Sequence, residues 1–399
     1  MPTPAISFLL TIGILFLFSK TVGILLSRVR IPSVVGEIAG GIIIGPYALG
    51  QFLNSLFHTP VMVINGEVSL FSEIAVILII FSAAAENGMS GLRKAGFAAP
   101  LVATFGALTP MLFGIYFYLA TGQHFSAALL LGAAMAATSL AVTVEVMQRM
   151  KERYETETNL ILNASALDDV VSIIVLAVAL TIISTGSITV EHVISVTIGT
   201  TVTWLLMLLL SVTLIPQFIK ILYRLHEDTL IESASLAIAF AMSSISTIVG
   251  LTPVVGAYLG GISLGTSNAK EIASRVATVL KNSLGPLFFA VIGAELNISI
   301  FLDPAVLIGI LVLTAIAVAG KVLGAFFPSL LHLRNARSAL MVGVAMIPRG
   351  EVGLVIAGIA LQDNLLPQSI YAEIIGMIMI TTIVGPIWIQ RLFERSKGD

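Results

Sequence analysis

Long apolar runs recur along the whole chain. Runs such as Ala5–Ser27, Ala305–Leu331 and Ile370–Trp388 approach or exceed the roughly 20 residues that a helix needs to cross a hydrocarbon core of about 30 Å. Of the 399 residues, 57% are hydrophobic and only 11% are charged, whereas an average soluble domain carries about 25% charged residues. The sequence therefore predicts an all-α polytopic membrane protein, whose spans are helices and not barrel strands.

Composition also excludes several classes of site and partner. There is no cysteine, and the five histidines are scattered without the spacing of metal ligands, so no thiolate metal site and no cofactor is expected. A net charge of −2 speaks against a nucleic-acid partner, because phosphate binding needs clustered basic residues. The first run lacks a basic segment before it and a small-residue cleavage site after it, so it is interpreted as a retained helix and not as a signal peptide.

Hydropathy, with glycine, proline and charge as punctuation, predicts 13 transmembrane spans. They begin near Ala5, Ile31, Leu70, Ala95, Phe125, Thr158, Val190, Thr229, Pro253, Ser283, Ala305, Ser338 and Ile370. All but three of the 20 lysines and arginines follow odd-numbered spans. Because cytoplasmic loops carry the excess of basic residues, we expect the N-terminus outside and the C-terminus in the cytoplasm of a bacterial inner membrane.

An internal repeat relates the two halves of the chain. Val34-Val35-Gly36, Gly40-Gly41-Ile42 and Gly45 recur 220 residues later as Val254-Val255-Gly256, Gly260-Gly261-Ile262 and Gly265. A weaker match relates Ala85-Glu86 to Ala294-Glu295, so each match pairs a span with the seventh span after it. Since seven is odd, the paired helices run in opposite directions, which predicts inverted-topology repeats of the kind found in alternating-access transporters. The alternative is that the glycines mark only tight helix packing.

The same rule pairs span 5 with span 12, and we predict that both are discontinuous helices that cross at mid-membrane. Span 12 contains Pro348-Arg349-Gly350-Glu351, where proline removes a backbone donor and two charges cannot face lipid. Span 5 contains Thr138-Ser139, a weaker signal of a break; the alternative is that these small residues form only a helix-packing face. Broken helices in matching halves place freed carbonyls and half-helix ends where a cation can be held.

Span 6 carries the adjacent carboxylates Asp168 and Asp169 about a dozen residues from its cytoplasmic start. Each charge at that depth costs on the order of 2.5–3.5 kcal/mol, which indicates partners and a function. Lys321 in span 11 is the expected partner of one of them, because the flanking Gly320 and Gly324 permit close helix approach. The remaining negative charge can be neutralised by a sodium ion or by a proton, and competition for one site is the chemistry of antiport. The alternative is a purely structural ion cluster.

Further charges are assigned accessory roles. Arg349 and Glu351 are interpreted mainly as a structural brace at the break in span 12. Glu37, Glu86 and Glu295 lie toward helix ends and are interpreted as hydrated interface residues.

These residues make the sequence similar to the bacterial monovalent cation:proton antiporters, a family that includes the NapA-type sodium/proton antiporters. The resemblance covers nearly the whole chain, and its specific part is the aspartate pair together with Lys321. It implies that Asp169 is the principal ion and proton carrier, that Asp168 is the partner of Lys321, and that Thr138 and Ser139 line the site. Na+ would then be held by Asp169 and Asp168.

The resemblance also implies a homodimer that works by an elevator movement. The moving core would comprise spans 4–6 (residues 94–185) and spans 11–13 (305–395), and the dimer scaffold spans 1–3 (1–90) and 8–10 (229–300), with span 7 (190–225) as a linker. Exchange of Na+ or Li+ for H+ would be electrogenic and would serve pH homeostasis. Rival readings are a K+/H+ antiporter of the same fold and, more remotely, an intramembrane aspartyl protease, whose aspartates stand on two separate helices.

Overall fold

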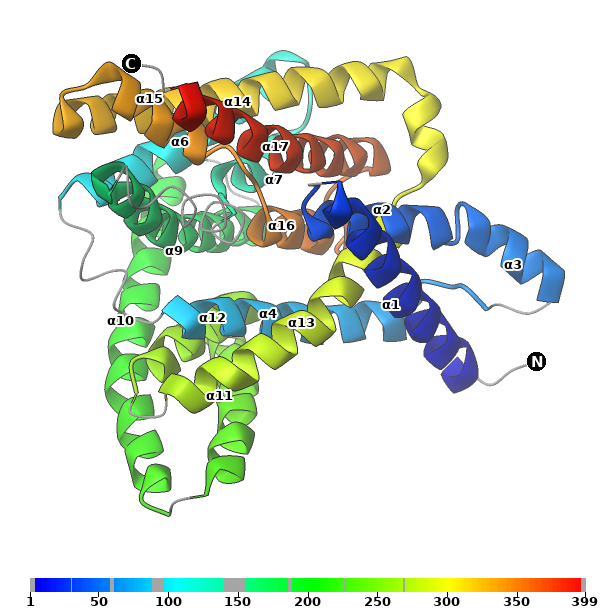
Figure 1. Ribbon diagram of the computed structural model, residues 1–399, viewed down its shortest axis with the longest axis horizontal. Helices are drawn as coiled ribbons and strands as arrows, with labels where there is room; N and C mark the ends of the chain where they lie inside the picture. Colours follow the sequence, from blue (N-terminus) through cyan, green and yellow to red (C-terminus); the bar gives the residue numbers. More distant parts are fainter. Residues whose placement is uncertain are drawn as a thin grey trace. The chain divides into compact units, whose positions relative to one another are not determined.

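The computed structural model describes residues 4–29, 31–57, 61–87, 97–139, 155–185, 189–225, 227–267 and 270–395, and within these ranges the chain forms helices and no strand (Figure 1). The chain divides into two compact units. The first comprises Met1–Val63, Lys94–Leu176 and Ile292–Asp399, and the second comprises Ile64–Arg93 and Ala177–Val291. These units do not coincide with the predicted core and scaffold, a division that concerns movement during transport and stays a prediction.

The first unit contains most of the helices. They are α1 (Pro4–Arg28), α2 (Ser33–Ile44), α3 (Leu49–Phe57), α6 (Ala98–Ala120), α7 (Phe125–Ala136), most of α9 (Glu155–Thr185), the short 3-10 helix η1 (Ile298–Leu302), α14 (Pro304–Leu333), α15 (Ala336–Ala345), α16 (Glu351–Gln362) and α17 (Gln368–Arg395). The second unit contains α4 (Gly66–Asn87), α10 (Val190–Tyr223), α11 (Asp228–Ile248), α12 (Pro253–Gly265) and most of α13 (Lys270–Ala294).

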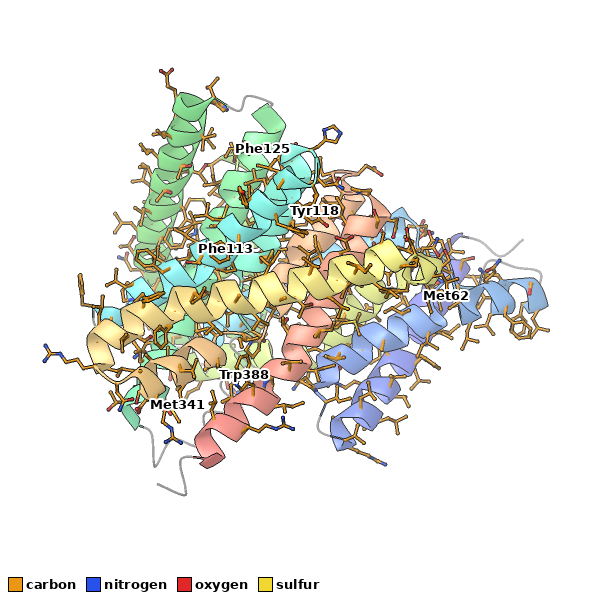
Figure 2. All side chains as sticks on the ribbon, turned by 90° about the horizontal axis from the view of Figure 1, so that it is seen from above. Met62, Phe113, Tyr118, Phe125, Met341 and Trp388 are labelled. Carbon is orange, nitrogen blue, oxygen red and sulfur yellow. The ribbon has the colours of Figure 1, made fainter. Side chains whose placement is uncertain are left out.

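Eight helices in the described ranges are long and apolar enough to cross a membrane, or nine if the bent pair α2–α3 is one span. Five shorter apolar helices accompany them, among them α7, α12, α15 and most of α16. The prediction of an all-helical membrane architecture is therefore confirmed, while the count of 13 spans stays a prediction. Two faces of one helix can differ in exposure: on α6, the side chain of Phe113 is 42% exposed and that of Tyr118 only 3% (Figure 2).

The long helix α14 lies directly against α6. A side-chain carbon added at Gly320 would come within 2.6 Å of Pro110 Cα, and one added at Gly324 would collide with the carbonyl oxygen of Phe105. Small residues allow two helix backbones to approach this closely, and close packing drives helix association inside membranes. Because Lys321 stands between these two glycines, the contact fixes its position along α6.

The glycine repeat corresponds to a repeated helix contact, present once in each unit. In the first unit, a carbon added at Gly36 of α2 would lie 2.6 Å from Gly23 Cα of α1. In the second unit, a carbon added at Gly256 of α12 would lie 2.7 Å from Ser243 Cα of α11. Each residue of the second contact lies 220 positions further along the sequence than its counterpart in the first. The sequence repeat therefore corresponds to the same helix contact in both units.

The helical runs at spans 5 and 12 both stop. α7 ends at Ala136, and Ala137 has extended backbone. The chain stays non-helical to Ser139, where this described range ends. α15 ends at Ala345, and no helix covers Ile347–Gly350 before α16 begins at Glu351. Proline has no N–H for a helical hydrogen bond and glycine weakens helix propensity, which accounts for the break between α15 and α16.

The tight contact at Gly256 leads to a stability prediction. Gly256→Ala should lower the melting temperature of the detergent-purified protein, because overpacking a tight contact typically costs about 1–3 kcal/mol. Gly199→Ala on α10 is the matched control, since a carbon there has no neighbour within 4 Å and alanine favours helix over glycine by up to about 1 kcal/mol. An equal melting temperature for the two variants would show that α11 and α12 do not approach as closely as described.

Candidate functional site

Asp168 is buried within α9 and pairs with a buried lysine. It lies 13 residues after the helix start at Glu155, or about 20 Å along the axis. Lys321 Nζ of α14 is 2.8 Å from Asp168 Oδ1, and both side chains are 0% exposed. Removing one partner of such a pair leaves an uncompensated buried charge, which typically costs about 3–5 kcal/mol. The two helices are therefore electrostatically tied at this point.

The same lysine also caps the end of α7. Lys321 Nζ donates a second hydrogen bond, of 2.6 Å, to the carbonyl oxygen of Ala136, the last residue of the helix. The last carbonyls of a helix have no partner within the helix, and the helix dipole makes this end negative. The ammonium group of Lys321 supplies both a hydrogen-bond donor for the carbonyl and a positive charge for the negative helix end.

Arg349 provides a second buried cap for the same helix end. Its Nη1 atom donates to the carbonyl oxygens of Met135 and, at 3.0 Å, of Ala137, and its Nη2 atom donates to Ala317 of α14 at 3.4 Å. The side chain is 0% exposed. Because guanidinium presents several donors in a fixed plane, it serves neighbouring carbonyls that a single ammonium group cannot reach together. Three successive carbonyls at the end of α7, those of Met135, Ala136 and Ala137, thus accept hydrogen bonds from two positively charged side chains.

The non-helical segments that follow α7 and precede α16 contact each other beside Lys321 and Arg349. The Ser139 N–H donates to the Pro348 carbonyl at 2.8 Å, and Thr138 Oγ1 donates to the Met346 carbonyl at 3.4 Å. A carbon added at Gly350 would lie 2.6 Å from Ser139 Oγ, so glycine is required for this approach. The breaks near Ala136 and Pro348 therefore meet in one place, beside the Asp168–Lys321 pair.

One acceptor and one donor at this place remain unsatisfied. Asp168 Oδ2 and Arg349 Nε are buried and have no hydrogen-bond partner among the described residues. The side chains of Asp169 and Glu351 lie outside the described part of the structure. A buried carboxylate oxygen without a donor favours a bound proton or a metal ion.

The geometry brings five of the predicted site residues together and leaves their roles as predictions. Asp168, Lys321, Thr138, Ser139 and Arg349 come from four separate stretches of the sequence and meet at the end of α7. Binding of ions and protons by Asp168 and Asp169 stays a prediction, as do the assignments of Thr138 and Ser139.

Sequence reasoning missed the backbone groups and misjudged two glutamates. The carbonyls of Met135, Ala136 and Ala137 have no sequence signal, because every residue carries one. Glu37 and Glu295 were expected to be hydrated, but they are only 3% and 8% exposed. This expectation was wrong because adjacent helices cover both residues, and Glu37 also pairs with Lys20 at 3.2 Å.

Comparison with known proteins identifies the family. The model of the family "Sodium/hydrogen exchanger, transmembrane" matches residues 13–395. The chain is 31% identical to a Na+/H+ antiporter of Enterococcus hirae, over 97% of this chain and 99% of that protein. It is 30% identical to the high-affinity Na+/H+ antiporter NhaS3 of Synechocystis, over 98% of this chain and 91% of that protein.

One further relative and one solved structure are also similar to this chain. The Na+/H+-K+ antiporter GerN of Bacillus cereus is 29% identical over 97% of this chain and 96% of that protein. The solved structure of the sodium proton antiporter MjNhaP1 from Methanocaldococcus jannaschii is similar with a TM-score of 0.72 over the full length of both chains. At 17% identity this likeness concerns the fold alone. The chain therefore belongs to the sodium/hydrogen exchanger family, whose members are multi-pass membrane transporters and not enzymes.

Proposed function

We propose that this protein exchanges Na+ or Li+ for H+ across the membrane. The observation that carries the proposal is the buried Asp168–Lys321 pair at the broken end of α7, 2.8 Å between charged atoms, with the second carboxylate, Asp169, next in sequence. The names of the relatives from Enterococcus hirae and Synechocystis support the same exchange.

The division of roles follows from charge. Lys321 balances Asp168 and holds the end of α7, while Arg349 is turned toward carbonyls of α7 and α14. Asp169 is then the carboxylate that Na+ and H+ occupy in turn, since a carboxylate this far along a membrane span is stable only when neutralised. Asp168 Oδ2, with Thr138 and Ser139 beside the break, supplies further oxygen ligands. No resident cofactor is needed, because both cations are substrates.

Alternating access requires that this site face each side of the membrane in turn. We assign the movement to an elevator-type displacement of spans 4–6 and 11–13 against a scaffold of spans 1–3 and 8–10 in a homodimer. The glycine contacts that recur at an offset of 220 residues support two related halves, and inverted halves give inward- and outward-open states of similar energy. α7 and the α15–α16 pair are the two discontinuous spans that cross at the site in this proposal.

Orientation rests on the distribution of basic residues. The bacterial inner membrane, with the N-terminus outside and the C-terminus in the cytoplasm, places nearly all lysines and arginines on the cytoplasmic side. Two aspartates with one lysine at the site fit electrogenic exchange and the NapA-type members of the family.

K+/H+ exchange is the second candidate. One relative, GerN of Bacillus cereus, carries K+ as well as Na+ in its name. The two functions are separated by reconstituting the purified protein in proteoliposomes and titrating a pH gradient with Na+, Li+ and K+. Dissipation of the gradient by Na+ and Li+ supports the first proposal, whereas dissipation by K+ alone supports the second.

Asp169→Asn should abolish cation-driven proton movement in this assay, because the amide can neither release a proton nor neutralise Na+. Asp303→Asn is the matched control: Asp303 is exposed and caps α14 by accepting from Ala305 N–H at 2.8 Å, and asparagine caps helices equally well. The control should retain exchange. Exchange by Asp169→Asn at the rate of the unmodified protein would remove Asp169 as the carrier.

Lys321→Ala should weaken the coupling of exchange to membrane voltage, because the charge that balances Asp168 is lost. The measurement is the Na+-dependent proton flux at voltages set by a K+ gradient and valinomycin. Arg275→Ala serves as control, since Arg275 and its partner Asp228 are both 64% exposed, so losing this pair leaves no buried charge. An unchanged voltage dependence in Lys321→Ala would contradict the proposed role.

A further inference from the structure

A second polar cluster lies where the chain leaves α13 and meets α16 and α17. Gln362 Nε2, at the end of α16, donates to Glu295 Oε1 at 3.3 Å. Gln368 Nε2, at the start of α17, donates to the backbone carbonyl of Glu295 at 3.1 Å. The hydroxyl of Tyr371 donates to the Ile292 carbonyl at 2.8 Å. Three hydrogen bonds therefore join α16 and α17 to the end of α13, and one of them reaches the carboxylate of Glu295.

This cluster contains more acceptors than donors. Glu295 Oε2 and Gln368 Oε1 are both buried, and neither has a hydrogen-bond partner among the described residues. The amide of Gln368 is held in its orientation, because turning it would place its oxygen against the carbonyl oxygen of Glu295. Two buried oxygen atoms with free lone pairs thus remain on residues that a hydrogen bond joins.

The charge of Glu295 is also uncompensated. The residue is 8% exposed, and the ion pairs found among the described residues do not include it. An ionised carboxylate buried without a partner costs several kcal/mol. By contrast, the half-buried Glu373 on the same helix as Gln368 receives a hydrogen bond from the Tyr118 hydroxyl. The carboxylate of Glu295 therefore needs a cation or a proton to neutralise it, because the described ion pairs do not.

The donor set indicates the class of partner. A carboxylate oxygen and an amide oxygen are hard ligands, which suit Na+ or K+ and not soft transition metals. One carboxylate neutralises one positive charge, so a divalent ion would leave a net buried charge. The described residues also contain no group of three or more His, Asp or Glu side chains that could hold a metal ion. A monovalent cation balances the site.

We propose that Glu295 Oε2 and Gln368 Oε1 form an accessory binding site for a monovalent alkali cation, separate from the Asp168–Lys321 site. A cation here would join Glu295 to α17 in addition to the hydrogen bonds already present. The site does not depend on the proposed exchange activity, since it is defined by burial and by the two unsatisfied oxygens.

The test is cation-dependent thermal stability of the purified full-length protein, measured in NaCl, KCl or N-methyl-D-glucamine chloride at equal ionic strength. An Asp169→Asn background removes the proposed transport site. In that background, an upward shift of the melting temperature with NaCl or KCl should persist, because a ligand that binds only the folded state stabilises it. Adding Glu295→Gln should abolish the shift, and adding Gln368→Leu should weaken it.

Glu373→Gln is the matched control, because its carboxylate already has a donor, and it should leave the shift unchanged. Melting in N-methyl-D-glucamine chloride shows whether each variant is folded. A cation shift that survives Glu295→Gln overturns the proposal. So does a protein stabilised by acidification alone, with no response to Na+ or K+, since Glu295 would then hold only a proton. Failure of the transport assay leaves this result unaffected, so the two proposals are judged separately.

Discussion

Two buried, positively charged side chains hold the end of helix α7, and the candidate site is arranged around that interaction. A helix that stops inside an apolar protein exposes carbonyls that water cannot reach, and each unsatisfied group there costs free energy. Lys321 and Arg349 satisfy three such carbonyls in succession. Lys321 and Arg349 stabilise the end of α7 by satisfying its carbonyls. The negative helix end and Asp168 in turn stabilise these two buried positive charges.

Different features of the chain position the two positively charged side chains. Lys321 reaches the site because Gly320 and Gly324 let α14 lie directly on α6. Arg349 reaches it because the chain between α15 and α16 is not helical. The backbone carbonyl of Arg349 also accepts a 2.5 Å hydrogen bond from Thr382 of α17. A substitution that enlarges Gly320 would therefore displace a charge at the site, although Gly320 itself makes no polar contact there.

Much of this arrangement was predictable from the sequence. Hydropathy indicated an all-helical membrane protein, the Pro348-Arg349-Gly350 stretch indicated a break, and a lysine between two glycines indicated a close helix contact. These signals are strong because charges, prolines and glycines inside apolar runs carry a high free-energy cost unless the fold uses them.

Other features left no trace in the sequence. The groups that Lys321 and Arg349 cap at the end of α7 are backbone carbonyls of alanine and methionine, and no residue type predicts which carbonyls are capped. The buried Glu295 accepts hydrogen bonds from two glutamines that follow it by 67 and 73 residues. Hydropathy reports the depth of a residue in the membrane but not which neighbours cover it. Position near a helix end was therefore a poor guide to hydration.

The most direct test of the central claim is a double-mutant cycle between Asp168 and Lys321, read as melting temperature in detergent. Asp168→Asn and Lys321→Met should each lower the melting temperature strongly, since each leaves one buried charge without its partner. The double variant should be less destabilised than the sum of the two single effects, because it contains neither charge. Additive losses would show that the two residues do not compensate each other, and the account of the site given above would be contradicted.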